Sequence, residues 1–182
     1  MNAPVALVIG AGDATGGAIA RRFARGGYTV CVTRREQARL QPLVAQIEAE
    51  GGKAHAFGSD AREEEQVQAL VAQIEERIGP IGVMVFNIGA NSPMSILEET
   101  SRRYRKMWEM GCLAGFLNAR EVARRMVARE PDAQGMRGTL LFTGATASLR
   151  GSAHFAGFSG AKAALRALAQ SMARELGPLG VH

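Results

Sequence analysis

The stretch from Val5 to Arg35 constrains the fold most, because it contains every part of one βαβ unit in order. An unbroken apolar run, Val5 to Ile9, has the length and composition expected of a parallel strand that is buried on both faces. The glycine-rich segment Gly10 to Gly17 follows at once and predicts a turn. A helix over Ala18 to Arg25 and a β-branched strand over Tyr28 to Thr33 complete the unit.

The order of strand, glycine-rich turn and helix also predicts a binding function. It brings backbone N–H groups and the N-terminus of a helix to one point, which suits a phosphate group. A dinucleotide is the natural ligand of such a unit. A tight turn that binds nothing is the alternative interpretation of the same glycines.

The remainder of the chain repeats the alternation of strands and helices. The apolar periodicity predicts helices over 36–50, 62–78, 101–129 and 153–177 and strands over 53–57, 81–87 and 138–143. This order predicts an α/β fold with a doubly wound parallel sheet, the Rossmann fold. No linker or low-complexity run divides the sequence, so we expect residues 1–182 to form a single dinucleotide-binding domain.

Composition excludes several other classes of protein. The 182 residues are 47% apolar and carry a net charge of +5, but the arginines are spread over several helices and aromatic residues make up only 5%, which is typical of a solvated surface and not of a nucleic-acid site. No apolar run approaches the roughly 20 residues that span a bilayer. Cys31 and Cys112 have no metal-ligand spacing. We therefore expect a cytoplasmic protein without a metal, bound neither to nucleic acid nor to a membrane.

The two predicted helices 101–129 and 153–177 differ from the others, because their long apolar stripes consist partly of small residues. One face of each helix can pack on the sheet, and the remaining apolar surface could pack on a second subunit. We expect a homo-oligomer that forms through these helices. Burial of both stripes within one chain is the alternative.

Three segments of the sequence, Gly10 to Gly16, Asp60-Ala61 and Asn87-Ile88-Gly89, resemble motifs of one family and occur in the same order and at the same elements. That family is the short-chain dehydrogenases/reductases, and the resemblance covers the whole chain. Gly10, Ala14 and Gly16 fall on the glycines of its TGxxxGxG loop, with Ala14 replacing the middle one. Asp60-Ala61 resembles the Asp-Val pair that holds the adenine, and Asn87-Ile88-Gly89 resembles the end of the NNAG signature. The resemblance implies a nicotinamide dinucleotide held by residues of these motifs and of the segments beside them: Gly10, Gly12, Asp13, Ala14, Thr15, Gly16, Thr33, Arg34, Arg35, Asp60, Ala61, Asn87, Gly89 and Lys162.

The end of the second predicted strand favours NADP(H) over NAD(H). An acidic residue there would bind the ribose 2′-hydroxyl, whereas this chain has Thr33-Arg34-Arg35, and a guanidinium group can pair with a 2′-phosphate through two hydrogen bonds. Asp13, where some NADP-dependent relatives carry a basic residue, argues for NAD(H), which stays possible. A solvated pair of arginines at the start of a helix is the alternative.

The catalytic residues of the family are largely replaced. Its Tyr-x-x-x-Lys pair corresponds to Phe158 and Lys162, and the longer spacing of enoyl reductases would need a tyrosine at Phe155. The family's serine falls on Ala145 and its asparagine falls on Cys112. Lys162 is therefore the one catalytic residue that the resemblance assigns, and the phenol mechanism does not carry over.

Three functions follow, in order of preference. The first is an oxidoreductase that moves hydride between NADP(H) and a small carbonyl or alcohol substrate, with Lys162 orienting the cofactor and the proton coming from water or from Ser148, His154 or Ser159. The second is an NADP(H)-binding sensor or partner subunit without turnover. The third is a purely structural relative.

The C-terminal residues 177–182 resemble the lead-in to the family's sixth strand. Relatives continue with that strand and with a segment that closes over the substrate. The resemblance thus implies a C-terminally short fold in which Leu140-Leu141-Phe142 forms an edge strand. The substrate stays undefined, because the residues that shape its pocket in relatives lie largely beyond this sequence.

Overall fold

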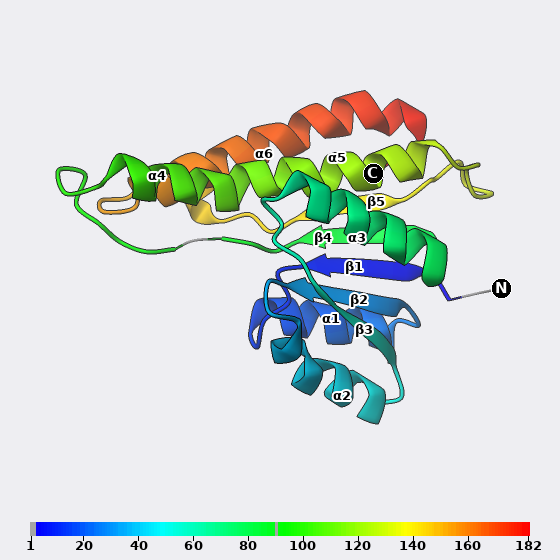
Figure 1. Ribbon diagram of the computed structural model, residues 1–182. Coiled ribbons are helices and arrows are strands. Elements are labelled where there is room, and N and C mark those ends of the chain that lie inside the picture. The colour runs from blue at the N-terminus through cyan, green and yellow to red at the C-terminus, as the bar shows by residue number, and fades with distance from the viewer. Residues whose placement is uncertain (1–2, 90) are drawn as a thin grey trace.

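Each predicted strand forms in the computed structural model, which describes residues 3–89 and 91–182 (Figure 1). The strands are β1 (Val5–Ile9), β2 (Thr29–Arg34), β3 (Lys53–Gly58), β4 (Ile81–Phe86) and β5 (Thr139–Phe142). They form a five-stranded parallel sheet in the order β3-β2-β1-β4-β5. After β3, which is at one edge, the chain crosses to the other side of β1 and adds β4 there, so the strand order reverses between β1 and β4. The predicted doubly wound α/β fold is confirmed.

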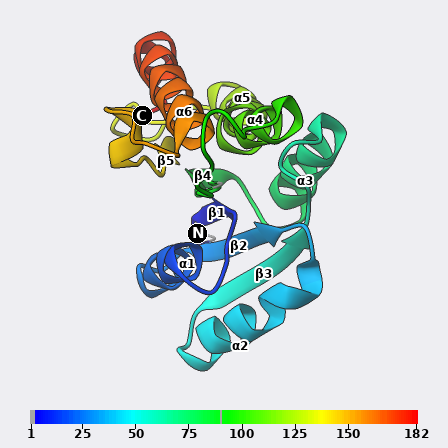
Figure 2. The same cartoon turned by 90° about the vertical axis from the view of Figure 1, so that its left-hand side faces the viewer.

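Helices cover both faces of the sheet, as the end-on view in Figure 2 shows. One face carries α1 (Thr15–Arg25) and α2 (Gln41–Ala49), and the other carries α3 (Glu64–Arg77), α5 (Ala114–Val127) and α6 (Ala156–Leu176). The remaining helical segments are α4 (Ser101–Trp108), the π-helical turn η2 (Glu109–Leu113) and the 3-10 turns η1 (Gln37–Leu40), η3 (Thr146–Ser148) and η4 (Gly177–Leu179).

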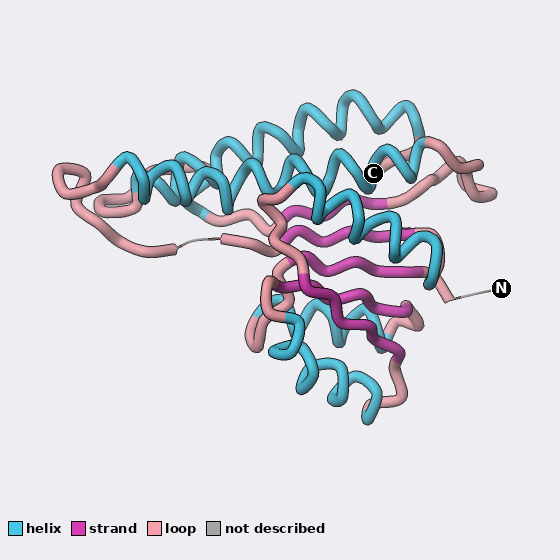
Figure 3. Tube along the Cα trace, viewed as in Figure 1, coloured by secondary structure: helices cyan, strands magenta, loops and turns pink. Residues whose placement is uncertain are grey.

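The apolar run of β1 is unbroken because both of its faces are buried. Ala6 and Val8 pack toward α1 and α2, whereas Val5, Leu7 and Ile9 pack toward α3, α5 and α6. All five side chains are at most 1% exposed. The tube view in Figure 3 shows this strand at the centre of the sheet. The carboxyl end of β1 therefore lies in the middle of the row formed by the carboxyl ends of the five strands.

The predicted turn over Gly10 to Gly17 is too long, because α1 begins at Thr15. Gly16 and Gly17 form the first turn of the helix and pack against the backbone of the preceding loop. A methyl group on Gly16 would collide with the Gly10 carbonyl oxygen, and one on Gly17 would lie 2.6 Å from the Gly12 carbonyl oxygen. Here the glycines allow a helix to approach a loop closely, and they do not break the helix.

The predicted helix over 101–129 is divided into α4, the π-helical turn η2 and α5, which follow one another in a single rod (Figure 1). The π turn contains Glu109 to Leu113, and Gly111 within it packs so closely on α6 that a methyl group there would lie 2.8 Å from Ala161 Cβ. None of the described helices is both long and apolar enough to cross a membrane.

β5 is the outer strand of the described sheet, as expected. The final residues pair with its start, because the His182 N–H donates to the Gly138 carbonyl at 2.9 Å and the Leu140 N–H donates to the His182 carbonyl at 2.7 Å. Leu141 is 40% exposed, so one face of this strand lacks cover within the described residues.

Candidate functional site

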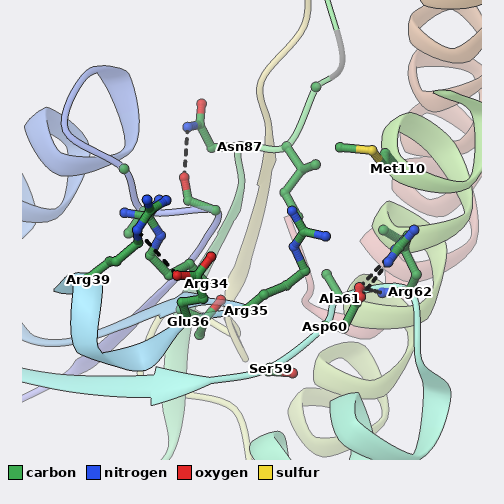
Figure 4. A pocket seen from close by; sticks show the side chains of 17 residues that line it. Arg34, Arg35, Glu36, Arg39, Ser59, Asp60, Ala61, Arg62, Asn87 and Met110 are labelled. Carbon is green, nitrogen blue, oxygen red and sulfur yellow. Dashed lines mark hydrogen bonds and ion pairs between the residues drawn. The ribbon is translucent and has the colours of Figure 1, made fainter. Parts of the chain in front are cut away.

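A pocket of about 290 Å³ lies at the carboxyl ends of β1 to β4, where the strand order reverses (Figure 4). Open α/β sheets bind their ligands at this position, because the connections on either side diverge and leave a crevice. The wall consists of residues from the glycine-rich turn, the ends of β2, β3 and β4, and the helical rod: Gly10, Ala11, Gly12, Thr33, Arg34, Arg35, Glu36, Arg39, Ser59, Asp60, Ala61, Arg62, Asn87, Ile88, Gly89, Met110 and Ala114.

The glycine-rich turn forms one side of this pocket. Gly10 has a φ of +82°, and a side chain there would also lie 2.7 Å from Ile88 Cγ1. The N–H groups of Gly10 and Ala11 both donate to the Thr33 carbonyl, at 3.1 and 3.0 Å, which joins the turn to β2. Within the described residues no side chain caps α1, which follows this turn but does not itself line the pocket.

Arginines make the wall of the pocket beside this turn positive. Arg34 ends β2, Arg35 follows it, and Arg39 comes from η1 (Figure 4). Arg39 is paired with Glu36 at 3.3 Å, but Arg34 and Arg35 form no ion pair or side-chain hydrogen bond with any described residue. Two unpaired guanidinium groups at the rim of a cavity suit a dianionic ligand such as a phosphate monoester.

Asp60, at the end of β3, is bound by a neighbour. Arg62 donates from Nε to Asp60 Oδ1 at 2.9 Å and from Nη2 to Oδ2 at 2.5 Å. This hydrogen-bonded pair lowers the pKa of Asp60, and the charge of Arg35 adds to the effect. Figure 4 shows Arg62 between Asp60 and the helical rod. Asp60 therefore lines the pocket as an ionised carboxylate whose two oxygens already accept hydrogen bonds.

A chain of hydrogen bonds joins four elements at the centre of the site. Asn87 Nδ2 donates to the Gly10 carbonyl at 3.3 Å, and Thr143 Oγ1 donates to Asn87 Oδ1 at 2.9 Å. Lys162 Nζ donates to the carbonyls of Thr143 and Ile88, at 2.8 and 3.0 Å. The glycine-rich turn and the ends of β4 and β5 are thereby fixed relative to α6.

Gly89 marks the inner end of the pocket. A methyl group on Gly89 would lie 3.5 Å from Lys162 Nζ and 3.7 Å from Phe158 Cε2, so both side chains lie directly beside this glycine. Lys162 is 4% exposed, and its burial lowers the pKa of its ammonium group.

Ala145 and Cys112, at the positions of the family's serine and asparagine, offer no acid or nucleophile. Ala145 accepts a hydrogen bond from Ser148 Oγ through its carbonyl oxygen, at 2.7 Å. Cys112 lies in the π turn, where burial raises the pKa of its thiol. His154 is exposed and has a φ of +68°, and Ser159 is buried with its hydroxyl oxygen unpartnered in the described structure.

Most of the predicted cofactor contacts meet in this pocket. The pocket is lined by these members of the predicted set: Gly10, Gly12, Thr33, Arg34, Arg35, Asp60, Ala61, Asn87 and Gly89. Asp13 and Ala14 instead line a neighbouring hollow against α2, Thr15 is exposed, and Gly16 supports the turn from behind. Lys162 lies behind Gly89 and not on the wall itself.

Sequence reasoning missed several residues that line the pocket. Arg39 could have been found, since it follows Arg35 by one helical turn. Arg62 could have been found from its position beside Asp60. Met110 and Ala114 could not, because only the packing of the helical rod against the sheet brings them to the pocket. The part of the chain described by the structure holds no cluster of three or more histidine, cysteine or acidic side chains that could ligate a metal ion.

A parallel sheet with a glycine-rich turn, an uncapped helix and a crevice at the reversal of strand order defines a dinucleotide-binding protein of the Rossmann type. A sequence profile described as short chain dehydrogenase matches residues 4–182. The chain therefore belongs to the short-chain dehydrogenase/reductase family, whose members are oxidoreductases that use NAD(P) and act on small molecules.

Individual relatives agree with this assignment. The crystal structure of a short-chain dehydrogenase from Rhodopseudomonas palustris is 51% identical, superimposes with a TM-score of 0.90, and is matched over 100% of this chain and 82% of that one. A short-chain dehydrogenase/reductase from Armillaria gallica is 30% identical over 97% of this chain and 67% of its own length. The L-rhamnose 1-dehydrogenase (NAD(P)+) of Azotobacter vinelandii is 31% identical over 97% of this chain and 68% of its own length. The chain thus spans about two thirds of these two curated relatives.

Proposed function

We propose that residues 1–182 act as a single cytoplasmic dinucleotide-binding domain that transfers hydride between NADP(H) and a small carbonyl or alcohol substrate at an atypical site. One observation carries the cofactor half of this proposal. The pocket at the reversal of strand order is lined by the backbone of the glycine-rich turn at Gly10 to Gly12 and by Arg34 and Arg35, which form no ion pair with any described residue. Both features suit phosphate groups, and NADP(H) carries phosphates at two separated positions.

The arrangement favours NADP(H) over NAD(H). The 2′-phosphate would meet Arg34 and Arg35, and Arg39 is near enough to share the same rim. Asp13, which argued for NAD(H) from the sequence, lines a separate hollow beside α2 and does not line this pocket. Repulsion between Asp13 and a phosphate at the arginine rim is therefore a weak effect.

The adenine end depends on a different group of residues. Asp60 and Ala61 line the pocket opposite Met110, so a flat base would lie between the end of β3 and the helical rod. Arg62 holds the carboxylate of Asp60 in place, and the buried Asn118 Nδ2 donates to the Ala61 carbonyl at 3.1 Å. These bonds fix the end of β3 before any ligand is present, which lowers the entropy that binding must overcome.

The reacting end supports the oxidoreductase proposal less directly. Lys162 and Phe158 lie together beside Gly89, as the resemblance implies for the pair at these positions. When bound, the nicotinamide would supply or accept the hydride, and the protein would need mainly to orient it. The replacement of the catalytic phenol by Phe158 favours a second candidate, an NADP(H)-binding sensor or partner subunit without turnover.

The first experiment is a titration of the purified chain with NADPH and, separately, with NADH. Nicotinamide fluorescence gives the dissociation constants, and the shift in melting temperature checks them by linkage. We expect tighter binding of NADPH. Failure of the folded chain to bind either dinucleotide would contradict the proposal.

Variants at the arginines of the pocket test which side chains cause the expected preference for NADPH over NADH. Arg35→Ala removes a charge-assisted hydrogen bond, so the dissociation constant of NADPH should rise about 10- to 100-fold while that of NADH changes little. Arg77→Ala is the matched control, because Arg77 is exposed in the last turn of α3, outside the pocket. An equal loss of both cofactors in Arg35→Ala would place the 2′-phosphate elsewhere.

Turnover distinguishes the two candidate functions. A chain that binds NADPH and oxidises it with aliphatic or aromatic aldehydes and ketones is an oxidoreductase. A chain that binds NADPH tightly but turns over no member of a broad carbonyl and alcohol panel is the sensor or partner subunit.

A further inference from the structure

Lys162 has hydrogen-bonding capacity beyond its two bonds in this structure. An ammonium group carries three N–H donors, and two of them are directed at the carbonyls of Ile88 and Thr143. No carboxylate pairs with Nζ within the described residues. The third N–H has no acceptor among the described residues, and Nζ lies 3.5 Å from the point that a Cβ on Gly89, a residue of the pocket wall, would occupy.

The neighbouring hydroxyl groups are already engaged or badly suited to give up a proton. Thr143 Oγ1 donates to Asn87 Oδ1, and Ser148 Oγ donates to the Ala145 carbonyl. Phe158, whose ring lies beside Lys162 at Gly89, has no proton to give. The hydroxyl of Ser159 is buried, and no described residue is placed to return a proton to it.

We propose that Lys162 Nζ is itself the proton donor of the reaction and gives its third proton to the substrate oxygen, a task that the phenol performs in relatives. This proposal rests on the proposed oxidoreductase function. In the direction of reduction, the carbonyl carbon gains a hydride from the reduced nicotinamide, and the electron pair of the C=O π bond moves to oxygen. That oxygen takes a proton from the Lys162 ammonium group. The products are the alcohol, the oxidised nicotinamide and a neutral lysine amine, which water then reprotonates.

Burial supports this role, because it lowers the pKa of Lys162 and makes the ammonium a stronger acid than an exposed one. The titratable or charged groups on the elements around it are His154 before α6, Arg166, Arg174 and Glu175 in α6, Arg102, Arg103, Tyr104, Arg105 and Lys106 in α4, Glu109 and Cys112 in η2, and Arg120, Glu121, Arg124 and Arg125 in α5. None of them forms a hydrogen bond or an ion pair with Lys162 in the described structure. The two backbone carbonyls hold the amine in place without the counter-charge that would keep it protonated.

The proposal predicts opposite pH dependences for the two directions of reaction. Reduction requires the ammonium form, so its rate is constant at low pH and falls as pH rises through the pKa of Lys162. Oxidation requires the neutral amine as a base, so its rate rises through the same pH range. Both profiles should share one midpoint, which lies at lower pH than for an exposed lysine.

The chain contains only three lysines, Lys53, Lys106 and Lys162, so this midpoint can be measured without any substrate. Lysine labelled with ¹³C at Cε gives three NMR signals whose shifts report protonation. Lys53 and Lys106 are exposed, and Lys53→Ala and Lys162→Met assign the signals. We expect one signal, lost in Lys162→Met, to titrate at lower pH than the other two. Co-titration of all three signals would overturn the proposal.

Chemical rescue tests the proton transfer itself. Lys162→Ala should lower the rate of carbonyl reduction by about 100-fold or more, the usual contribution of a general acid. Added methylamine or ethylamine should restore part of that rate, and across a series of primary amines the restored rate should depend on the pKa of the amine. A lysine that only positions the cofactor would show no such dependence. Lys53→Ala is the matched control and should retain the wild-type rate.

The outcomes separate this proposal from the function on which it rests. If the wild-type chain reduces carbonyls and Lys162→Ala binds NADPH but is as active as wild type, the proposal is overturned and the oxidoreductase function stands. If the wild-type chain binds NADPH without any turnover, the oxidoreductase function fails and this proposal fails with it. Should Lys162→Ala not fold, Lys162→Arg gives the same test, because a guanidinium keeps the charge but does not release its proton.

Discussion

Gly12 in the glycine-rich turn and Gly16 in the first turn of α1 limit different properties of the protein. Gly16 packs against the backbone of the turn, and a methyl group there would collide with the Gly10 carbonyl oxygen and lie 2.8 Å from Ala11 Cα. Gly12 lines the pocket, and no atom of the residues described by the structure lies within 4 Å of the position of its missing methyl group. Gly16 is therefore required by the fold, and Gly12 is required only by what enters the pocket.

Alanine at these two positions should separate stability from binding. Gly16→Ala should lower the free energy of unfolding by about 2 kcal/mol or more, because backbone atoms must move to admit the methyl group. Gly12→Ala should leave the free energy of unfolding within about 0.5 kcal/mol and weaken NADPH binding. Urea unfolding and nicotinamide fluorescence measure the two effects. A fully stable Gly16→Ala would contradict the close packing of α1 on the turn.

The residues that the sequence assigned to the cofactor remain predictions, but the structure shows which of them line the pocket and which of them neighbouring side chains modify. Asp60 was expected to hold the adenine, and it does line the pocket. Arg62 nevertheless binds both of its oxygens. That interaction could not be read from the motif, because side-chain pairs across a turn depend on its backbone conformation.

Helix α5 crosses β4 and α6 at a glycine. A methyl group on Gly115 would lie 2.5 Å from Leu165 Cδ1 and 3.3 Å from Phe86 Cε1. Leu165 is 2% exposed and Phe86 is completely buried. The close approach of these elements depends on the absence of a side chain at Gly115, and the leucine fills the space instead.

A double-mutant cycle should detect this contact. Gly115→Ala overpacks the crossing and should lower the free energy of unfolding by about 1–3 kcal/mol. Leu165→Ala leaves a cavity and should lower it by about 2–5 kcal/mol. The double variant should be more stable than the sum of the two effects predicts, because the added methyl group occupies part of the cavity. Strict additivity in urea unfolding would show that the two residues do not share this space.

Apolar periodicity alone does not reveal that the predicted 101–129 helix is divided by a π-helical turn. Apolar spacing predicted one helix, and the rod is indeed continuous (Figure 1). The π-helical turn within it inserts one additional residue per turn, and Met110 lies on the pocket wall while Gly111 packs on α6. The local pattern of side chains does not predict the π-helical turn, because that turn depends on how the rod packs against α6 and the sheet.

Large apolar side chains remain exposed along the helical rod and the loop before it. Trp108 is 43% exposed, Tyr104 is 45% exposed and Phe116 is 36% exposed, and Leu97 in the preceding loop is 94% exposed. The sequence predicted leftover apolar surface on the helices 101–129 and 153–177, and these residues provide it on the first of them. Exposed apolar patches of this kind commonly form contacts between subunits.

We predict a homo-oligomer that buries this surface. Light scattering should give a mass above 19.3 kDa at micromolar concentration. Trp108→Glu should weaken assembly by about 2 kcal/mol, or roughly 30-fold, as removal of a central aromatic contact does. Leu149→Glu is the matched control, because Leu149 is 69% exposed but lies outside both helices. A monomeric wild-type chain would contradict the prediction.

The amino-acid sequence by itself determined the elements and their order. Buried parallel strands, amphipathic helices and glycine-rich turns each have a local pattern, because burial acts on every residue of a short segment in the same way. The tertiary structure alone decided which distant residues meet: Arg62 with Asp60, Met110 with the pocket, and Lys162 with the carbonyls of Ile88 and Thr143. These contacts depend on how elements pack, and packing depends on the shapes of many side chains at once.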